Sequence, residues 1–314
     1  MGIEYFSEEL KRSVQGKKVA VFSHPRVDPD GFAAALVSSY MLNYIGALSS
    51  YAYLDDMNSL AKRMNEKYRP SAPPADFLPD IALVVDACGL KYSHRGKEFH
   101  GSEVFVIDHH QCGSISGSKS FVDPHASSSC ELILKISSSL GFALTPDMAT
   151  ALLAGLLFDT AIFKYASSES VISAAELINI GGDYQTALTF SKRELTKSLR
   201  MAKLKAAKSI ELLNSGDLII AFTTTDIFEG EIAEALLNLG ADIAFVAAPR
   251  GKGVRVSGRA DEKAVSSGIN LADFFKESGG GHEGAAGAYI EDSVENVLRG
   301  IKTRLIARLK TGSF

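Results

Sequence analysis

The chain places single acidic residues at the ends of apolar runs, and this pattern constrains its fold more than any other. Asp86 ends the run IALVVD, Asp108 follows VFVI, and Asp159 ends ALLAGLLFD. Apolar runs of this length are typical of buried strands or core helices, so each carboxylate lies where an element leaves the core. A pair of divalent cations would compensate such isolated charges together, which predicts a two-metal hydrolase.

The composition is that of an ordinary globular protein with two domains. The chain has 314 residues, of which 46% are hydrophobic and 22% charged, and it exceeds the usual size of one domain. The net charge of -4 offers no overall attraction for long nucleic acid. We expect reduced thiols, because no CxxC spacing occurs among Cys88, Cys112 and Cys130. No apolar stretch is long enough to cross a bilayer, so we expect a cytoplasmic protein without a membrane partner.

The first part of the chain, up to about residue 190, alternates short β-like runs with helical segments. Strands are expected at 17–23, 50–54, 80–86 and 103–107, and helices at 30–46, 56–67, 126–140, 146–158 and 169–180. This alternation predicts an α/β domain with a doubly wound, mainly parallel sheet, which binds ligands beyond the carboxyl ends of its strands.

The rest of the chain predicts a linker helix and a second, smaller α/β domain. The segment 191–213 has a long helical pattern, with Ser191 and Glu194 spaced as a capping box. After it come a strand, a helix, two strands, a glycine cluster and a last helix near 292–309. The predicted divisions are therefore 1–190, the linker 191–213, and 214–314.

Seven polar residues at these element ends form a candidate metal constellation. They are His24, Asp28 and Asp30, then Asp86, then His109 with Asp108 before it, and Asp159. Asp86 is the best candidate for a carboxylate that bridges two ions. Mixed oxygen and imidazole ligands suit Mn²⁺, Mg²⁺ or Co²⁺ better than structural zinc. Two such ions would hold a hydroxide for in-line attack on phosphorus.

Each of these residues also has a simpler explanation. Asp28 and Asp30 precede a helix well and are suited to capping it, and Asp86 alone could simply end a strand. His110 could be a core histidine with its hydrogen bonds satisfied. Asp108 is better explained as a residue that orients an imidazole than as a ligand. Their joint occurrence at strand ends favours the metal site, because the simpler explanations require several coincidences.

The second domain carries a candidate phosphate-binding surface. Arg255, Ser257 and Arg259 alternate and would share one face of a strand. The run Gly279, Gly280 and Gly281 could form an anion-binding nest of backbone N–H groups, with His282 as a further donor. The alternative is a solvated β-surface beside a flexible loop.

These motifs together resemble the DHH phosphoesterase superfamily. The resemblance rests on the triplet Asp108-His109-His110, on the motif from His24 to Gly31, and on Asp86 and Asp159-Thr160. The segment Gly279-Gly280-Gly281-His282, followed by Ala285-Ala286-Gly287, resembles the DHH-associated domain of RecJ-type exonucleases, nanoRNases and pAp phosphatases. Many family members carry an acidic residue where this chain has Phe32.

The resemblance implies a division of the ligands between two manganese ions. One ion would be held by His24, Asp28 and Asp86, and the other by Asp30, Asp86, His109 and Asp159. His110 would contact phosphate or the leaving group, with Asp108 beside it in the catalytic triplet. In the resembled family the second domain grips the nucleotide while the first domain cuts it.

The sequence thus predicts a metal-dependent phosphoesterase for short oligonucleotides, releasing mononucleotides from an end, with pAp as a second candidate substrate. The chain ends soon after the glycine motif, which favours short substrates over long DNA. A RecJ-like single-strand exonuclease, a cyclic or linear dinucleotide phosphodiesterase and a non-catalytic RNA-binding protein remain as alternatives. The apolar region 126–158 could form a homodimer face, although core packing explains it equally well.

Overall fold

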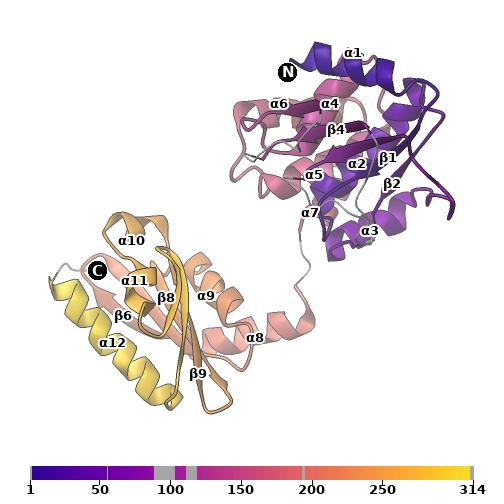
Figure 1. Cartoon of the computed structure of the whole chain (residues 1–314). Helices are drawn as coiled ribbons and strands as arrows, with labels where there is room; N and C mark the ends of the chain where they lie inside the picture. The colour runs from indigo at the N-terminus through magenta and orange to yellow at the C-terminus, as the bar shows by residue number, and fades with distance from the viewer. Residues whose placement is uncertain (1, 55, 88–102, 111–118, 193–194, 312–314) are drawn as a thin grey trace. The chain divides into compact units, whose positions relative to one another are not determined.

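The structure is a computed structural model that describes residues 2–54, 56–87, 103–110, 119–192 and 195–311. The chain forms two compact units, residues 1–193 and 194–314 (Figure 1). Cys88 and Cys112 lie outside the described residues, and Cys130 is a buried free thiol. None of the described helices is both long and apolar enough to cross a lipid bilayer.

The first unit contains a five-stranded sheet in the order β2-β1-β3-β4-β5, in which all neighbouring strands run parallel. The strands are β1 (Lys18–Phe22), β2 (Ser49–Tyr53), β3 (Ile81–Val85), β4 (Glu103–Asp108) and β5 (Lys119–Val122). The sequence predicted the first four strands. It missed β5, whose four residues are all half-buried and form no apolar run. Because the strands are parallel, their carboxyl ends meet at one edge of the sheet.

Seven helices accompany this sheet in the described part of the first unit. They are α1 (Ile3–Ser13), α2 (Pro29–Tyr44), α3 (Ser59–Tyr68), α4 (Ser129–Ser139), α5 (Pro146–Asp159), α6 (Ser168–Asn179) and α7 (Tyr184–Ser191). Phe6 of α1 and Phe32 of α2 are fully buried in one core cluster with Phe105 of β4. Helices α2 and α5 are apolar on nearly every side, as expected of helices enclosed by other elements.

The linker helix predicted over 191–213 is present only in the middle of that segment, and its predicted ends are wrong. Helix α7 ends at Ser191, whose Oγ donates to the carbonyl of Ala187 instead of capping a new helix. Helix α8 covers Lys197–Lys208 and starts at Thr196, whose hydroxyl accepts from the Leu199 N–H. The last part of the predicted helix is strand β6 (Glu211–Ser215), because its backbone pairs with the following strand.

The second unit contains a six-stranded mixed sheet in the order β10-β11-β9-β8-β7-β6. Its other strands are β7 (Leu218–Thr224), β8 (Ile243–Arg250), β9 (Gly253–Ala260), β10 (Gly279–His282) and β11 (Ala285–Ile290). Of these, β7 and β8 pair in parallel, and the other neighbours pair antiparallel. The predicted α/β class, a parallel sheet followed by a smaller α/β unit, is confirmed.

The helices of this unit belong to two separate core clusters. Besides α8, they are α9 (Glu229–Asn238), α10 (Glu262–Ser266), α11 (Leu271–Phe275) and α12 (Val294–Thr311). Phe274 and Phe275 of α11 pack with Phe245 of β8 in one cluster, to which α12 also contributes. Ile232 of α9 belongs to a second cluster with Val246, which directly follows Phe245 on β8 and therefore faces the opposite side of the sheet.

Candidate metal centre and substrate groove

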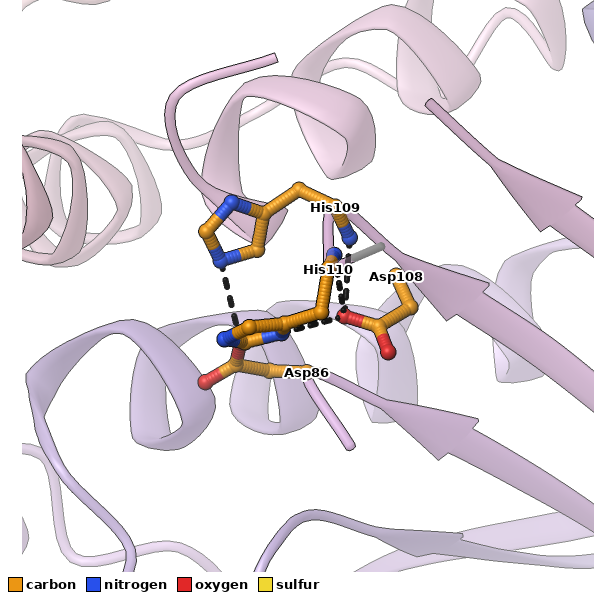
Figure 2. A group of neighbouring side chains, drawn as sticks. All are labelled: Asp86, Asp108, His109 and His110. Carbon is orange, nitrogen blue, oxygen red and sulfur yellow. Dashed lines mark hydrogen bonds and ion pairs between the residues drawn. The ribbon is translucent and has the colours of Figure 1, made fainter. Parts of the chain in front are cut away.

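The acidic and imidazole side chains predicted as metal ligands converge at the carboxyl edge of the parallel sheet. His24 follows β1, Asp86 follows β3, and Asp108 ends β4. Figure 2 shows the Asp108-His109-His110 triplet beside Asp86. Two helices contribute the remaining residues, Asp28 and Asp30 from the start of α2 and Asp159 from the end of α5.

Asp86 lies at the centre of this site, with each carboxylate oxygen facing a different histidine. Its Oδ2 is 3.4 Å from His24 Nε2, and its Oδ1 is 3.5 Å from His109 Nε2. The residue is buried and has a φ of 52°, a left-handed conformation that costs energy outside glycine. This backbone conformation directs a single carboxylate toward two sets of donors.

The donor atoms form three groups that share Asp86, and within each group they lie within 4.8 Å of one another. Two of them match the ligand sets that the family resemblance implies and are called the two donor groups below: His24, Asp28 and Asp86, and Asp30, Asp86, His109 and Asp159. The third contains Asp86, Asp108, His109 and His110, but Asp108 Oδ1 in this group already accepts hydrogen bonds from the N–H groups of His109 and His110. His109 Nε2 is 3.3 Å from Asp159 Oδ2. Two atoms that each bind one ion at about 2.1 Å lie about 3.0–3.4 Å apart, so these spacings fit shared ions.

His109 supplies a further sign that the site suits a cation. Its Nε2 atom is buried between the carboxylates of Asp86 and Asp159 but, among the described residues, makes no well-aligned hydrogen bond. A metal ion between this nitrogen and the two carboxylates would satisfy all three. The donor set contains oxygen and imidazole nitrogen without thiolate, which fits Mn²⁺, Mg²⁺ or Co²⁺.

Asp28 both caps a helix and faces the site, so its two explanations are compatible. Its Oδ1 accepts from the N–H groups of Asp30 and Gly31, at 3.0 and 3.1 Å. Its Oδ2 is 3.6 Å from His24 Nε2. Gly31 allows this close approach, because a Cβ there would lie 2.2 Å from Ser23 Oγ and 3.1 Å from Asp86 Oδ2.

Asp30 is held by the first turn of α4, a contact that the sequence analysis missed. The N–H groups of Ser129 and Cys130 donate to its two oxygens at 2.7 and 3.0 Å. The Ser129 hydroxyl also donates to Asp86 Oδ1 at 3.2 Å. A serine-rich segment before a helix is visible in the sequence, but its orientation toward two carboxylates depends on how α4 packs.

Hydrogen bonds outside the donor groups fix the imidazole rings. His24 Nδ1 is 2.8 Å from the carbonyl oxygen of Pro25, which leaves Nε2 directed at the site. Asp108 Oδ1 accepts from the N–H groups of His109 and His110 and lies 2.8 Å from His110 Nδ1. These contacts favour Asp108 as a residue that orients the triplet.

The titration of the site reflects its concentrated charge. Burial alone lowers the pKa of His24, but the carboxylates of Asp28 and Asp86 outweigh burial and raise it to about 11. The pKa of His109 is raised to about 11 in the same way, against burial, by Asp159 and Asp86. Without a cation the histidines therefore keep protons that neutralise the carboxylates, and a metal ion must displace these protons to bind.

Four of the six predicted substrate residues of the second unit, Arg255, Arg259, Gly280 and His282, line an open cavity of about 590 Å³, whereas Gly279 and Gly281 do not line it. Arg255, Ser257 and Arg259 lie on one face of β9, as predicted, and this cavity also includes Gly280 and His282. Glu229 at the start of α9 had no predicted role. Its carboxylate binds the Arg250 and Arg255 guanidiniums at 3.1 and 3.2 Å.

The predicted anion-binding nest at the glycine run is wrong. Gly279–His282 is strand β10, whose backbone pairs antiparallel with β11. The two strands approach so closely that a Cβ on Gly279 would lie 1.9 Å from the carbonyl oxygen of Gly287. A Cβ on Gly281, whose φ is 149°, would lie 2.3 Å from the carbonyl oxygen of Ala285. These two glycines serve the pairing of the hairpin.

Two family models match the chain, one on each unit. The DHH family N-terminal domain matches residues 18–156, and the DHHA1 domain matches residues 217–311. The chain belongs to the DHH family. The resemblance drawn from the sequence motifs is thereby confirmed, and the DHH triplet lies within the first match and the glycine-histidine motif within the second.

This DHH-family protein is similar along most of its length to two curated relatives. It is 27% identical over 299 residues to an uncharacterized protein of Methanocaldococcus jannaschii, covering 89% of each chain. It is 27% identical over 310 residues to the bifunctional oligoribonuclease and PAP phosphatase NrnA of Thermus thermophilus, covering 95% of this chain and 93% of the relative.

A solved structure shares the fold of the DHH-family protein. The crystal structure of an exopolyphosphatase-related protein from Bacteroides fragilis superimposes with a TM-score of 0.64 at 17% identity. The match covers 99% of this chain and 97% of the other. The two proteins therefore have the same fold along their length.

Proposed function

We propose that this protein is a metal-dependent phosphoesterase that hydrolyses short oligonucleotides, with pAp as a second substrate. The observation that carries the proposal is Asp86, whose two oxygens belong to two separate donor groups. Such a shared carboxylate suits a two-metal site for in-line displacement at phosphorus. The substrate class is supported by the Thermus thermophilus relative, named as an oligoribonuclease and PAP phosphatase.

In this proposal the two donor groups hold two divalent cations, with Mn²⁺ preferred and Mg²⁺ or Co²⁺ as alternatives. His24, Asp28 and Asp86 would hold one, and Asp30, Asp86, His109 and Asp159 the other. When bound, the pair would supply a hydroxide nucleophile near neutral pH and stabilise the leaving oxygen. Ser129 and the first turn of α4 keep the Asp30 and Asp86 carboxylates oriented.

His110 is the proposed residue for contact with phosphate or the leaving group. Its side chain is 48% exposed and lies beside the buried donor groups. The hydrogen bond that His110 Nδ1 donates to Asp108 outweighs the opposing effect of burial and raises the pKa of His110. This contact holds one proton on Nδ1 of His110 and turns Nε2 away from Asp108. A second proton, on Nε2, can then be given to a departing oxygen.

The second unit would grip the nucleotide through Arg255, Arg259 and His282, with the Gly279–Gly281 strand beneath. Glu229 fixes the guanidinium of Arg255 but leaves its side chain 67% exposed. An arginine held in this way keeps free N–H groups for phosphate oxygens.

The decisive experiment is a Mn²⁺-dependent product profile on 5′-labelled RNA and DNA of two, five and twenty-four residues. We expect rapid loss of the dimers and pentamers with slow loss of the long strands, and turnover of pAp in a parallel assay. Efficient digestion of the long strands would indicate a RecJ-like exonuclease instead. Turnover confined to a cyclic dinucleotide would indicate a cyclic dinucleotide phosphodiesterase, and no turnover with metal bound would indicate a binding protein.

A further inference from the structure

Helix α8 concentrates positive charge in a chain whose net charge is -4. The segment 195–210 has no Asp or Glu, and its basic residues are Lys197, Arg200, Lys203, Lys205 and Lys208. Side chains three and four residues apart lie on the same face of a helix. Four of the basic residues are exposed and share one such face, called here the basic stripe: Lys197, Arg200, Lys205 and Lys208.

The basic stripe is neither neutralised nor needed for packing. None of its four cations forms an ion pair with a carboxylate of the described residues. Elsewhere in the second unit Lys263 pairs with Asp242 at 3.0 Å, and Arg250 pairs with Glu229 at 3.1 Å. Helix α8 packs on the sheet through Ala206, on the side away from the stripe. The stripe is therefore free to meet a negatively charged partner.

A cavity of about 520 Å³ opens beside the basic stripe. Its apolar walls include Met201 of α8, Ile227 after β7 and Pro249 of β8, and the first two are 47% and 43% exposed. Lys205 lines the same cavity and joins it to the stripe. Among the described residues, none that lines this cavity lines the one around Arg255. A volume of this size falls within the range of small-ligand sites, about 300–1,000 Å³.

The loop on one side of the cavity has a fixed shape. The hydroxyl of Thr225 donates to the carbonyl of Ile227 at 2.7 Å, and the guanidinium of Arg250 donates to the carbonyl of Asp226. Phe228 ends the loop with a φ of 67°, a left-handed conformation that is costly for an aromatic residue. Asp226 lines the cavity, and its side chain is exposed and has no hydrogen bond or ion pair with a described residue. Its carboxylate is thus an available acceptor.

We propose that the basic stripe and its cavity bind single-stranded RNA, a function beyond the hydrolysis of short oligonucleotides. The cations of the stripe contact the phosphates of the RNA backbone. One base enters the apolar cavity beside Met201, and the 2′-hydroxyl of a ribose donates to Asp226. Because DNA lacks this hydroxyl, the surface binds RNA in preference to DNA.

An anionic membrane is the other polyanion that a basic helix can meet. Helices that lie in a membrane interface bury a broad apolar face and carry aromatic or leucine residues along it. On the exposed side of α8 the large apolar residues are Met201 and Leu204, which lie between cations, and the helix has no aromatic residue. The interspersed charges and the adjoining cavity therefore favour RNA.

The test measures the binding of full-length protein to a fluorescent single-stranded RNA by anisotropy, with EDTA present to prevent hydrolysis. The RNA is longer than the site of a typical single-strand binding module, about 4–16 nucleotides. Arg200→Gln combined with Lys205→Gln should weaken binding and reduce the slope of log affinity against log salt by about 1.4, because each phosphate contact contributes about 0.7. Lys276→Gln combined with Arg299→Gln removes the same charge from exposed positions elsewhere in the second unit and should leave the slope unchanged.

Asp226→Ala should reduce the preference for RNA over DNA of the same sequence, whereas Asp226→Asn, which keeps an oxygen acceptor, should retain it. Equal salt slopes for the α8 double variant and the parent would overturn the proposal. Loss of binding by the α8 variant to vesicles of equimolar phosphatidylcholine and phosphatidylserine, with RNA binding intact, would identify a membrane surface instead.

Turnover of a dinucleotide with Mn²⁺ is measured separately, so that the two proposals fail independently. The α8 double variant should cleave the dinucleotide like the parent, because Arg200 and Lys205 belong to neither the metal centre nor the cavity around Arg255. RNA binding through α8 without any turnover would refute the proposed function alone. Turnover with no RNA binding by the parent would refute the α8 surface alone.

Discussion

The hydroxyl of Ser129 donates to Asp86 Oδ1 at 3.2 Å, so a residue outside both donor groups orients the carboxylate that the groups share. Residues that orient metal ligands typically affect metal affinity by about 10–100-fold. We expect Ser129→Ala to weaken Mn²⁺ binding by about tenfold in calorimetric titration. Ser137→Ala is the matched control, because Ser137 is buried on the same helix but contacts Met41 Sδ. Equal affinities in the two variants would contradict the role of Ser129.

Replacement of the shared carboxylate tests the two-metal assignment itself. Asp86→Ala should abolish hydrolysis and weaken metal loading without unfolding the chain, because it also removes the repulsion between Asp86 and the neighbouring carboxylates of Asp30 and Asp159. Mass spectrometry measures the metal content, and circular dichroism shows whether the chain stays folded. The control is Asp217→Asn, which changes an exposed acid of the second unit. Full activity with metal bound in Asp86→Ala would refute the assignment.

His110 can be separated from metal binding. His110→Asn should lower kcat by about 100-fold, the usual scale for loss of a positioned proton donor, while Mn²⁺ affinity stays near that of the parent. His125→Asn is the control, because His125 is exposed and belongs to neither donor group. A loss of Mn²⁺ affinity that parallels the loss of kcat would make His110 a metal ligand instead.

The raised pKa values of the histidines predict how pH affects metal binding. His24 goes from 6.5 in the unfolded chain to about 11 in the folded protein, so its contribution to metal-free stability is complete below pH 6.5 and is lost as pH rises toward 11. The pKa of His109 is raised from 6.5 to about 11 as well, so its contribution to metal-free stability depends on pH in the same way. Mn²⁺ must displace these protons, so its affinity should rise by about tenfold per pH unit for each proton released.

Calorimetry in buffers with different ionisation enthalpies counts these protons directly. We expect proton release at neutral pH and a rise in Tm on adding Mn²⁺ that grows with pH. The Tm increase on adding Mn²⁺ can be compared at about pH 6 and about pH 8. Equal increases at the two pH values would contradict the protonated state of His24 and His109.

Gly155 on α5 tests the packing behind the site. A Cβ there would lie 2.4 Å from Cys130 Sγ and 2.9 Å from the Cα of Asp30. Gly155→Ala should therefore destabilise the protein by about 1–3 kcal/mol in urea unfolding, the usual cost of overpacking, and reduce Mn²⁺ affinity. Gly300→Ala on the exposed part of α12 should instead stabilise slightly through helix propensity. A neutral Gly155→Ala would show that α5 can move away from α2 and α4 freely.

The sequence predicted the parallel sheet and the convergence of the site because both depend on local pattern. An apolar run followed by Asp86 or Asp108 identifies a strand end without knowledge of its neighbours. Features that depend on pairing were missed or mispredicted. The glycine run became strand β10 because β11 lies beside it, and the end of the linker helix became β6 because it pairs with β7.

Inside the candidate site, too, the sequence did not predict the contacts that depend on how distant segments pack. Asp28 was expected to be either a cap or a ligand, and in the structure one oxygen caps α2 while the other faces His24. Ser129 and Glu229 had no predicted role, because each acts on partners far away in the chain. Single-residue patterns contain no information on such contacts, which arise only when the helices pack.

The shared carboxylate also determines the electrical balance of the loaded centre. The two donor groups contain four different carboxylates, from Asp28, Asp30, Asp86 and Asp159, because Asp86 counts once although it serves both. Four negative charges equal the charge of two divalent cations when the histidines are neutral. The position after Gly31 is Phe32, which is buried in the core and adds no charge. A phosphate group would thus meet ligand carboxylates whose charge two divalent cations balance, so that the negative charge near it would come from the hydroxide that the cations hold and from Asp108 beside Asp86.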